Sequence, residues 1–129
     1  MHDPVLFERN MLAIASNHPS ASAERLRLAS PDMRVGLDDA RDGSKIPYLD
    51  CADRRMYMCS KMDPRREAAK LAEAYASSGF YVFLGLGPAY LARELLDSGK
   101  VSSGMIVEYR AGTLRALLER MDLTHVLAD

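Results

Sequence analysis

The stretch of residues 80–108 constrains the fold of this chain more than any other part of its sequence. Residues 80–84 form a short apolar run, rich in β-branched and aromatic side chains, which predicts a strand buried on both faces. Gly85-Leu-Gly87 predicts a tight turn, and Pro88 suits the first position of the helix that the following leucines indicate. Residues 105–107 predict a second strand. The stretch therefore predicts two parallel strands joined by a crossover helix, as in a Rossmann-like sheet.

The glycine turn and the acid at the end of the second strand form the candidate binding site. Gly85 and Gly87 allow a close backbone approach to a ligand, and Glu108, 21 residues after Gly87, is placed to accept ribose hydroxyls. Tyr90 replaces the third glycine of the dinucleotide fingerprint. Phe83 replaces the acid that methyltransferases using S-adenosylmethionine have two residues before the first glycine. The alternative interpretation is a turn that needs glycine only for its backbone conformation, and the cofactor stays open.

The N-terminal half predicts a different kind of structure. Residues 4–16 and 20–28 have apolar positions at helical spacing, so we expect two amphipathic helices there. Residues 33–60 alternate between apolar and polar positions and contain the hairpin signal Asp42-Gly43, which predicts a small antiparallel β-meander. Pro47 cannot donate a hydrogen bond to a strand ladder, so we expect its strand to be an edge strand or to be bulged.

The C-terminal half continues the parallel pattern on both sides of the central stretch. Asp63-Pro64 has the cap-plus-proline signature of a helix start, and residues 124–127 predict a third short strand. The predicted fold class is therefore α/β, a partial Rossmann-like parallel sheet (βαβαβ) after an N-terminal helical segment and the meander. We place a boundary near Ser60, which divides the chain into residues 1–60 and a truncated Rossmann-like βαβ module, residues 61–129.

Composition excludes several classes of function. The chain has 129 residues, 48% of them hydrophobic, which is enough for a packed domain. Its net charge of −1 does not favour nucleic acid or an anionic membrane as a partner, and no apolar run approaches the length of a membrane span. Cys51 and Cys59 lack the spacing of a metal or redox site, and no signal peptide is visible. We therefore expect a reduced, cytoplasmic protein.

No motif in the sequence marks a catalytic residue or a metal ligand. The three histidines, His2, His18 and His125, are too far apart to form a ligand spacing, and no Ser, Cys or Lys stands in a nucleophile motif. Arg65 and Arg66 lie in the first turn of a predicted helix, which is the unfavourable end for cations. A bound anion or a neighbouring carboxylate would compensate them, and the simpler interpretation is two solvated arginines.

Several short motifs follow one another in a recognisable order. They are Phe7-x-x-Asn10-Met-Leu12, Pro19 with Glu24-Arg25-Leu26, Ile46-Pro47, Met56-Tyr57, Asp63-Pro64, Phe83-Leu-Gly85-Leu-Gly87-x-x-Tyr90, Ile106-Val-Glu108 and Met121-Asp-Leu123. This order resembles the N-terminal region of the motility-associated-factor proteins, bacterial flagellin glycosyltransferases that share a broader grouping with 6-hydroxymethylpterin diphosphokinase-like proteins. The resemblance covers essentially the whole chain. Ala89, Leu91 and Tyr109 stand where that family has glycine, histidine and proline.

The resemblance implies a role in flagellin O-glycosylation. In such proteins a nonulosonic sugar passes from a CMP donor to Ser or Thr of flagellin, in a catalytic domain that would follow residue 129. We therefore expect a non-catalytic N-terminal domain that acts in oligomerisation or acceptor recognition, with a second copy, the catalytic domain or flagellin as its partner. The alternative is a nucleotide- or S-adenosylmethionine-binding domain of a methyltransferase-like or pterin diphosphokinase-like enzyme, so enzymatic activity stays open.

Overall fold

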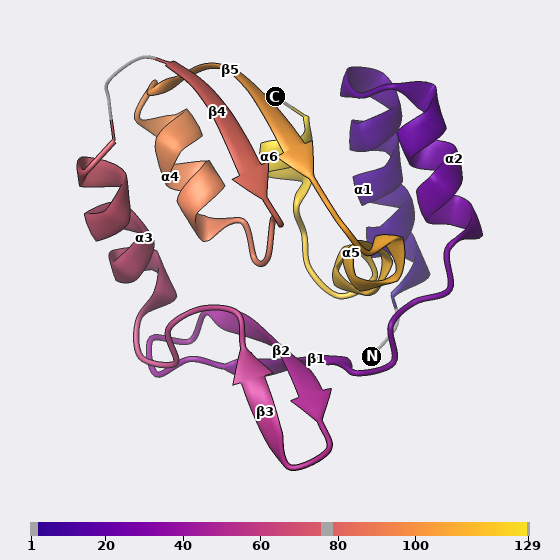
Figure 1. The fold of residues 1–129 in the computed structure, drawn as a ribbon, viewed down its shortest axis with the longest axis horizontal. Helices are drawn as coiled ribbons and strands as arrows, with labels where there is room; N and C mark the ends of the chain where they lie inside the picture. The colour runs from indigo at the N-terminus through magenta and orange to yellow at the C-terminus, as the bar shows by residue number, and fades with distance from the viewer. Residues whose placement is uncertain (1–2, 76–78, 129) are drawn as a thin grey trace.

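The computed structural model describes residues 3–75 and 79–128, which form an antiparallel sheet, a small parallel sheet and helices around them (Figure 1). The elements, in chain order, are α1 (Pro4–Asn17), α2 (Ser20–Leu28), β1 (Val35–Asp39), β2 (Lys45–Cys51), β3 (Arg54–Tyr57), α3 (Pro64–Glu73), β4 (Gly79–Leu84), α4 (Tyr90–Asp97), β5 (Val101–Val107), α5 (Ala111–Leu118) and α6 (Thr124–Leu127).

The two N-terminal helices are confirmed. The side chain of Asp3 accepts hydrogen bonds from the N–H groups of Val5 and Leu6, at 3.0 and 3.1 Å, and caps the start of α1. α1 and α2 pack beside α5 and α6, so the two ends of the chain share one hydrophobic core (Figure 1). The most deeply buried apolar side chains of this core are Met11, Ala116, Leu117 and Leu118.

The predicted meander is confirmed, with strand order β1-β2-β3 and a hairpin turn in which Gly43 has a φ of 89°. The prediction for Pro47 was wrong, because its strand, β2, is the central strand of this sheet. Pairing between β2 and β3 begins only at Tyr48, so Pro47 lies just beyond the last residue pair and its missing N–H leaves that ladder intact.

The strands β4 and β5 run parallel, as predicted, with Val82 beside Met105 in the register. The expectation that the first strand is buried on both faces was wrong. Only the side of β4 that carries Phe83 packs against the core, because no described element covers the other side. The large apolar side chains on the open side are Phe80, Val82, Leu84 and Met105, which are 62%, 50%, 69% and 53% exposed. We call this surface the β4–β5 face.

The predicted third strand is the helix α6, so the βαβαβ order does not form in the described residues. The carboxylate of Asp122 accepts hydrogen bonds from the N–H and hydroxyl of Thr124, at 3.1 and 2.5 Å, which favours a helical turn there. Val126 and Leu127 are buried on one side of that turn. Four residues are too few for periodicity to separate a strand from a helix. The parallel sheet therefore has two strands among the described residues, fewer than a full Rossmann fold.

One polar side chain lies at the centre of the core. Asn10 of α1 is fully buried, and its Nδ2 donates to the carbonyl oxygens of Leu118 and Met121, at 2.9 and 2.8 Å. Its Oδ1 accepts from the N–H of Leu123 at 3.0 Å. Asn10 thereby satisfies backbone groups at the end of α5 that would otherwise be buried without partners, and it fixes the path of the chain from α5 to α6.

Candidate functional site

The glycine turn joins β4 to α4 in a conformation that few residue types adopt. Gly85 and Gly87 have φ angles of 82° and 54°, and Ala89 has a φ of 65°. The N–H of Gly85 still donates to Val107 at 2.8 Å, so the turn begins where the sheet ends. The φ angles of this turn are therefore a reason for glycine at both positions, which is the reason that the alternative interpretation of the motif gives.

The start of the crossover helix differs from the prediction. Pro88 lies in the turn, and α4 begins two residues later at Tyr90. Ala89, between Pro88 and the helix, adopts a left-handed conformation. Pro88 is therefore not the first residue of α4. The N–H of Ala89 donates to the carbonyl oxygen of Leu86 at 3.0 Å and closes the turn.

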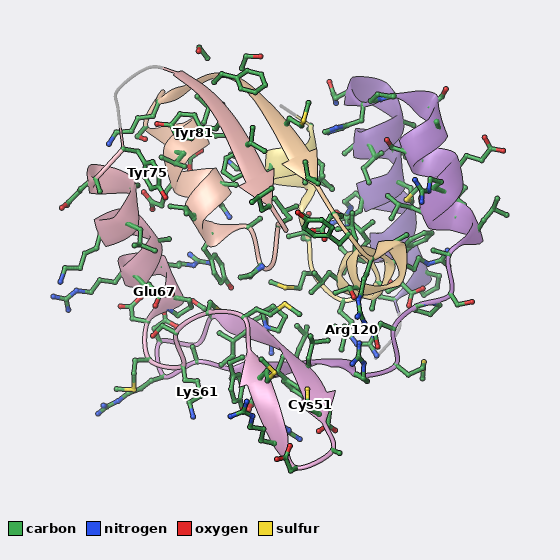
Figure 2. All side chains as sticks on the ribbon, in the orientation of Figure 1. Cys51, Lys61, Glu67, Tyr75, Tyr81 and Arg120 are labelled. Atoms are coloured by element: carbon green, nitrogen blue, oxygen red, sulfur yellow. The ribbon has the colours of Figure 1, made fainter. Side chains whose placement is uncertain are left out.

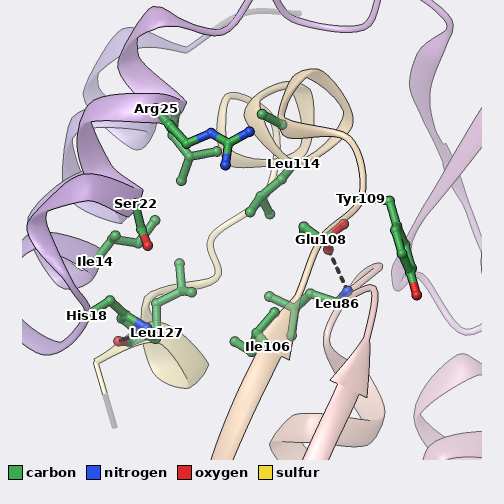
Figure 3. A pocket seen from close by; sticks show the side chains of 12 residues that line it. Ile14, His18, Ser22, Arg25, Leu86, Ile106, Glu108, Tyr109, Leu114 and Leu127 are labelled. Carbon is green, nitrogen blue, oxygen red and sulfur yellow. Dashed lines mark hydrogen bonds between the residues drawn. The ribbon is translucent and has the colours of Figure 1, made fainter.

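Glu108 meets the glycine turn at the carboxyl end of the parallel strands. Its Oε1 accepts a hydrogen bond from the N–H of Leu86 at 2.6 Å (Figure 3). The sequence predicted an acid beside this turn, and the structure places it there. The turn residue whose N–H contacts the acid is Leu86, between the two glycines.

A cavity of about 230 Å³ opens beside this contact. Leu86, Ile106 and Glu108 line it from the sheet end, and side chains of α1, α2 and α5 line it from the other side (Figure 3). Gly85 and Gly87 do not line it, although a Cβ at either position would meet no atom within 4 Å. The glycines thus shape the turn, and Glu108 is the predicted site residue that faces the cavity.

The end of α1 and the helix α2 bring three polar side chains to the cavity that the sequence did not single out as ligand contacts: His18, the residue after α1, and Ser22 and Arg25 of α2. His18 Nε2 lies 3.0 Å from the carbonyl oxygen of Leu127. Figure 3 shows Arg25 and Glu108 on either side of Leu114. Within the described residues, the Arg25 guanidinium makes no hydrogen bond or ion pair. No local pattern marks these residues, because they lie 83–90 residues before Glu108 in the sequence.

Arg115 holds α2 in the position that closes the cavity. Its Nη1 donates to the carbonyl oxygens of Leu26 and Arg27, at 3.0 and 2.9 Å, which are among the last carbonyls of α2. Its Nε donates to Glu119 at 2.8 Å, and its guanidinium lies 4.0 Å from the centre of the Phe7 ring. One side chain thus joins α1, α2 and α5 beside the cavity.

The arrangement offers one carboxylate, one cation and apolar walls. A carboxylate accepts hydroxyl hydrogens and a guanidinium donates to an anion or carbonyl, so the cavity can orient a small polar molecule. Over residues 3–75 and 79–128, no group of three or more His, Cys, Asp or Glu side chains could hold a metal ion. The geometry therefore supports the binding of a small polar molecule.

The comparisons with known proteins found no match. No protein-family model, no curated protein and no solved structure matches the chain. None of the helices in the described part of the chain combines the length and apolarity that crossing a bilayer requires.

Proposed function

We propose that this chain is a non-catalytic module in flagellin O-glycosylation, of the kind found at the N-terminus of the motility-associated-factor proteins. The contacts between its motifs support the proposal. Asn10, in the opening helix motif, binds the backbone of Met121 and Leu123 in the last motif. Leu86 in the glycine motif binds Glu108 in the strand-end motif. Four of the eight motifs that carry the resemblance are thus in contact, in two pairs.

The observation that carries the proposed role in oligomerisation is the β4–β5 face. Four large apolar side chains are exposed side by side on it, and neither strand contains a charged residue. Soluble monomers rarely leave a contiguous apolar surface of this kind uncovered. A second copy of the chain is the partner that suits it best, because an uncharged apolar face is complementary to itself in a two-fold dimer.

Sedimentation equilibrium tests this role. The protein is expected to form a concentration-dependent dimer, and Val82→Lys is expected to shift it to monomer by placing a charge at the centre of the interface. Val5→Lys, the same exchange at an exposed position of α1, serves as the matched control and should leave the dimer unchanged. A wild-type protein that stays monomeric up to high concentration would contradict the proposal.

A second candidate function is the binding of a nucleoside-bearing ligand in the Glu108 cavity. Glu108 lies at the end of the second parallel strand, and its Oε2 receives no hydrogen bond from the described residues, so it is free to accept a ribose hydroxyl. The volume of about 230 Å³ is below the roughly 300–1,000 Å³ that is usual for ligand sites, so it suits a nucleoside and not a dinucleotide.

A thermal-shift screen with CMP, UDP, NAD and S-adenosylmethionine tests this candidate. A ligand at about 100 times its Kd should stabilise the fold by about 2.7 kcal/mol, which raises Tm by several degrees. Glu108→Ala should abolish that shift, while Glu24→Ala, at an exposed acid of α2, should preserve it. A shift that persists in Glu108→Ala places the ligand elsewhere. This screen is independent of dimerisation, because Val82 does not line the cavity.

A further inference from the structure

A second cavity, of about 330 Å³, lies beyond the glycine turn. Four segments that are far apart in the sequence meet around it: the β1–β2 hairpin, the start of α3, the start of α4 and the loop from α5 to α6. Its volume lies within the range of small-molecule sites. We call it the basic cavity, because four Lys and Arg side chains line it with one carboxylate: Lys45, Arg65, Arg93, Arg120 and Asp122. His125 and Tyr90 line it as well.

The carboxylate of Asp122, which lines the basic cavity, already has hydrogen-bond and ion-pair partners. The carboxylate of Asp122 accepts two hydrogen bonds from Thr124 and lies 3.5 Å from Nη1 of Arg9. The Thr124 hydroxyl is the main reason why the pKa of Asp122 is lowered, so its charge is stabilised by groups outside the cavity. Among the described residues, no hydrogen bond or ion pair joins Asp122 to a cation that lines the cavity.

Acids next to the cavity neutralise part of its positive charge. Lys45 Nζ lies 2.6 Å from Oδ1 of Asp39. Asp97 has two partners, His125 Nε2 at 2.6 Å and Arg93 Nε at 3.8 Å. These pairs are about half exposed, so water weakens them and leaves them open to exchange for a stronger anion.

Two arginines that line the cavity make no hydrogen bond or ion pair with a carboxylate of the described residues. Arg65 lies over the ring of Tyr90, with its guanidinium carbon 5.9 Å from the ring centre. Arg65 contributes to the lowered pKa of Asp42, but that carboxylate accepts the N–H and hydroxyl of Ser44, both at 2.9 Å. Arg120 makes no side-chain hydrogen bond or ion pair within residues 3–75 and 79–128 (Figure 2).

One feature of the backbone increases the attraction of the cavity for an anion. α4 begins at the cavity with Ala89 as its N-cap, and no side chain caps its first N–H groups. The N-terminus of α3, where Arg65 lies, is already compensated by the Asp63 cap and by Glu67 in the same turn.

We propose that the basic cavity binds a small molecule that carries a phosphate group, with Arg65 and Arg120 as the main donors to the phosphate oxygens. Guanidinium groups match phosphate in geometry and charge, and Arg93 and Lys45 add to the local potential. The space beyond the phosphate is large enough for the rest of a small organic molecule. This site is separate from the Glu108 cavity, with which it shares no lining residue.

An NMR titration of the ¹⁵N-labelled protein tests this proposal. The probes are ribose 5-phosphate and inorganic phosphate, each compared with sodium chloride at equal ionic strength. We expect saturable shifts in the amides of residues 89–93 and 120–123, with ribose 5-phosphate binding more tightly than inorganic phosphate. Arg65→Gln and Arg120→Gln should each weaken binding about ten-fold, since each removes charge-assisted hydrogen bonds. Arg54→Gln, at an exposed arginine of β3, should change nothing.

The same experiment can overturn the proposal. Shifts that are linear and equal to those from chloride would mean that the cavity has no phosphate site. Unchanged affinity in Arg120→Gln, with a spectrum that shows the variant folded, would also contradict the assignment. Arg120→Lys separates charge from geometry, because it keeps the cation and loses the paired donors, and it should bind with intermediate affinity.

Discussion

Replacing Asn10 with alanine is expected to lower the free energy of unfolding by about 3–5 kcal/mol. The substitution removes hydrogen bonds to the carbonyls of Leu118 and Met121 and to the N–H of Leu123, and it leaves all three groups buried. Each buried group without a partner costs about 1–3 kcal/mol. The higher helix propensity of alanine offsets only about 0.5 kcal/mol of this loss.

Urea unfolding at neutral pH measures the effect of Asn10→Ala. Asn17→Ala is the matched control, because Asn17 lies in the same helix and its side chain makes one exposed hydrogen bond, to the carbonyl of Ala13. Its stability should change by no more than about 0.5 kcal/mol. A loss below about 1 kcal/mol in Asn10→Ala would mean that these hydrogen bonds do not organise the core.

Replacing Arg115 with methionine is expected to lower the free energy of unfolding by about 3 kcal/mol. Methionine keeps the apolar stem and removes the guanidinium that binds Glu119 and the end of α2. Glu119 is buried, so losing its cation destabilises the ionised carboxylate more than it would at the surface. The same change frees α2 from α5 and should open the Glu108 cavity.

The control for Arg115→Met is Arg27→Met. Arg27 also forms a paired contact with a carboxylate, that of Glu8 at 2.8 and 3.0 Å, but both side chains are about half exposed. An exposed pair contributes about 0–1 kcal/mol, so this variant should unfold close to the wild-type urea midpoint. Equal losses in the two variants would show that burial does not set the strength of the Arg115 contact.

Local patterns in the sequence were sufficient for the parts of the fold that depend on neighbouring residues. Asp3 predicted the start of α1 because capping involves residues two and three positions away. Gly85 and Gly87 predicted the turn after β4 because only glycine adopts its φ angles readily. Glu108 was placed beside that turn because parallel strands bring their carboxyl ends to one edge of the sheet.

Features that depend on distant contacts could not be predicted from the sequence. Residues 80–84 have the composition of a strand buried on both faces, but no described element packs on the β4–β5 face. Whether a strand face is covered depends on the whole fold and not on the strand's own residues. Arg25 and Arg120 reach their cavities through the packing of helices that are far apart in sequence. Asn10 looks like an ordinary polar position of α1, and its partners follow it by more than 100 residues.

The candidate ligand site depends on Glu108 lying beside the glycine turn, and therefore on β4 and β5 running parallel. A NOESY spectrum tests this directly. The parallel register pairs Phe80 with Ser103 and Leu84 with Val107, so we expect cross-strand contacts within each of these pairs. Contacts of Phe80 with Val107 and of Leu84 with Ser103 would mean antiparallel strands. Glu108 would then lie at the opposite end of the sheet from the glycine turn, which contradicts the account.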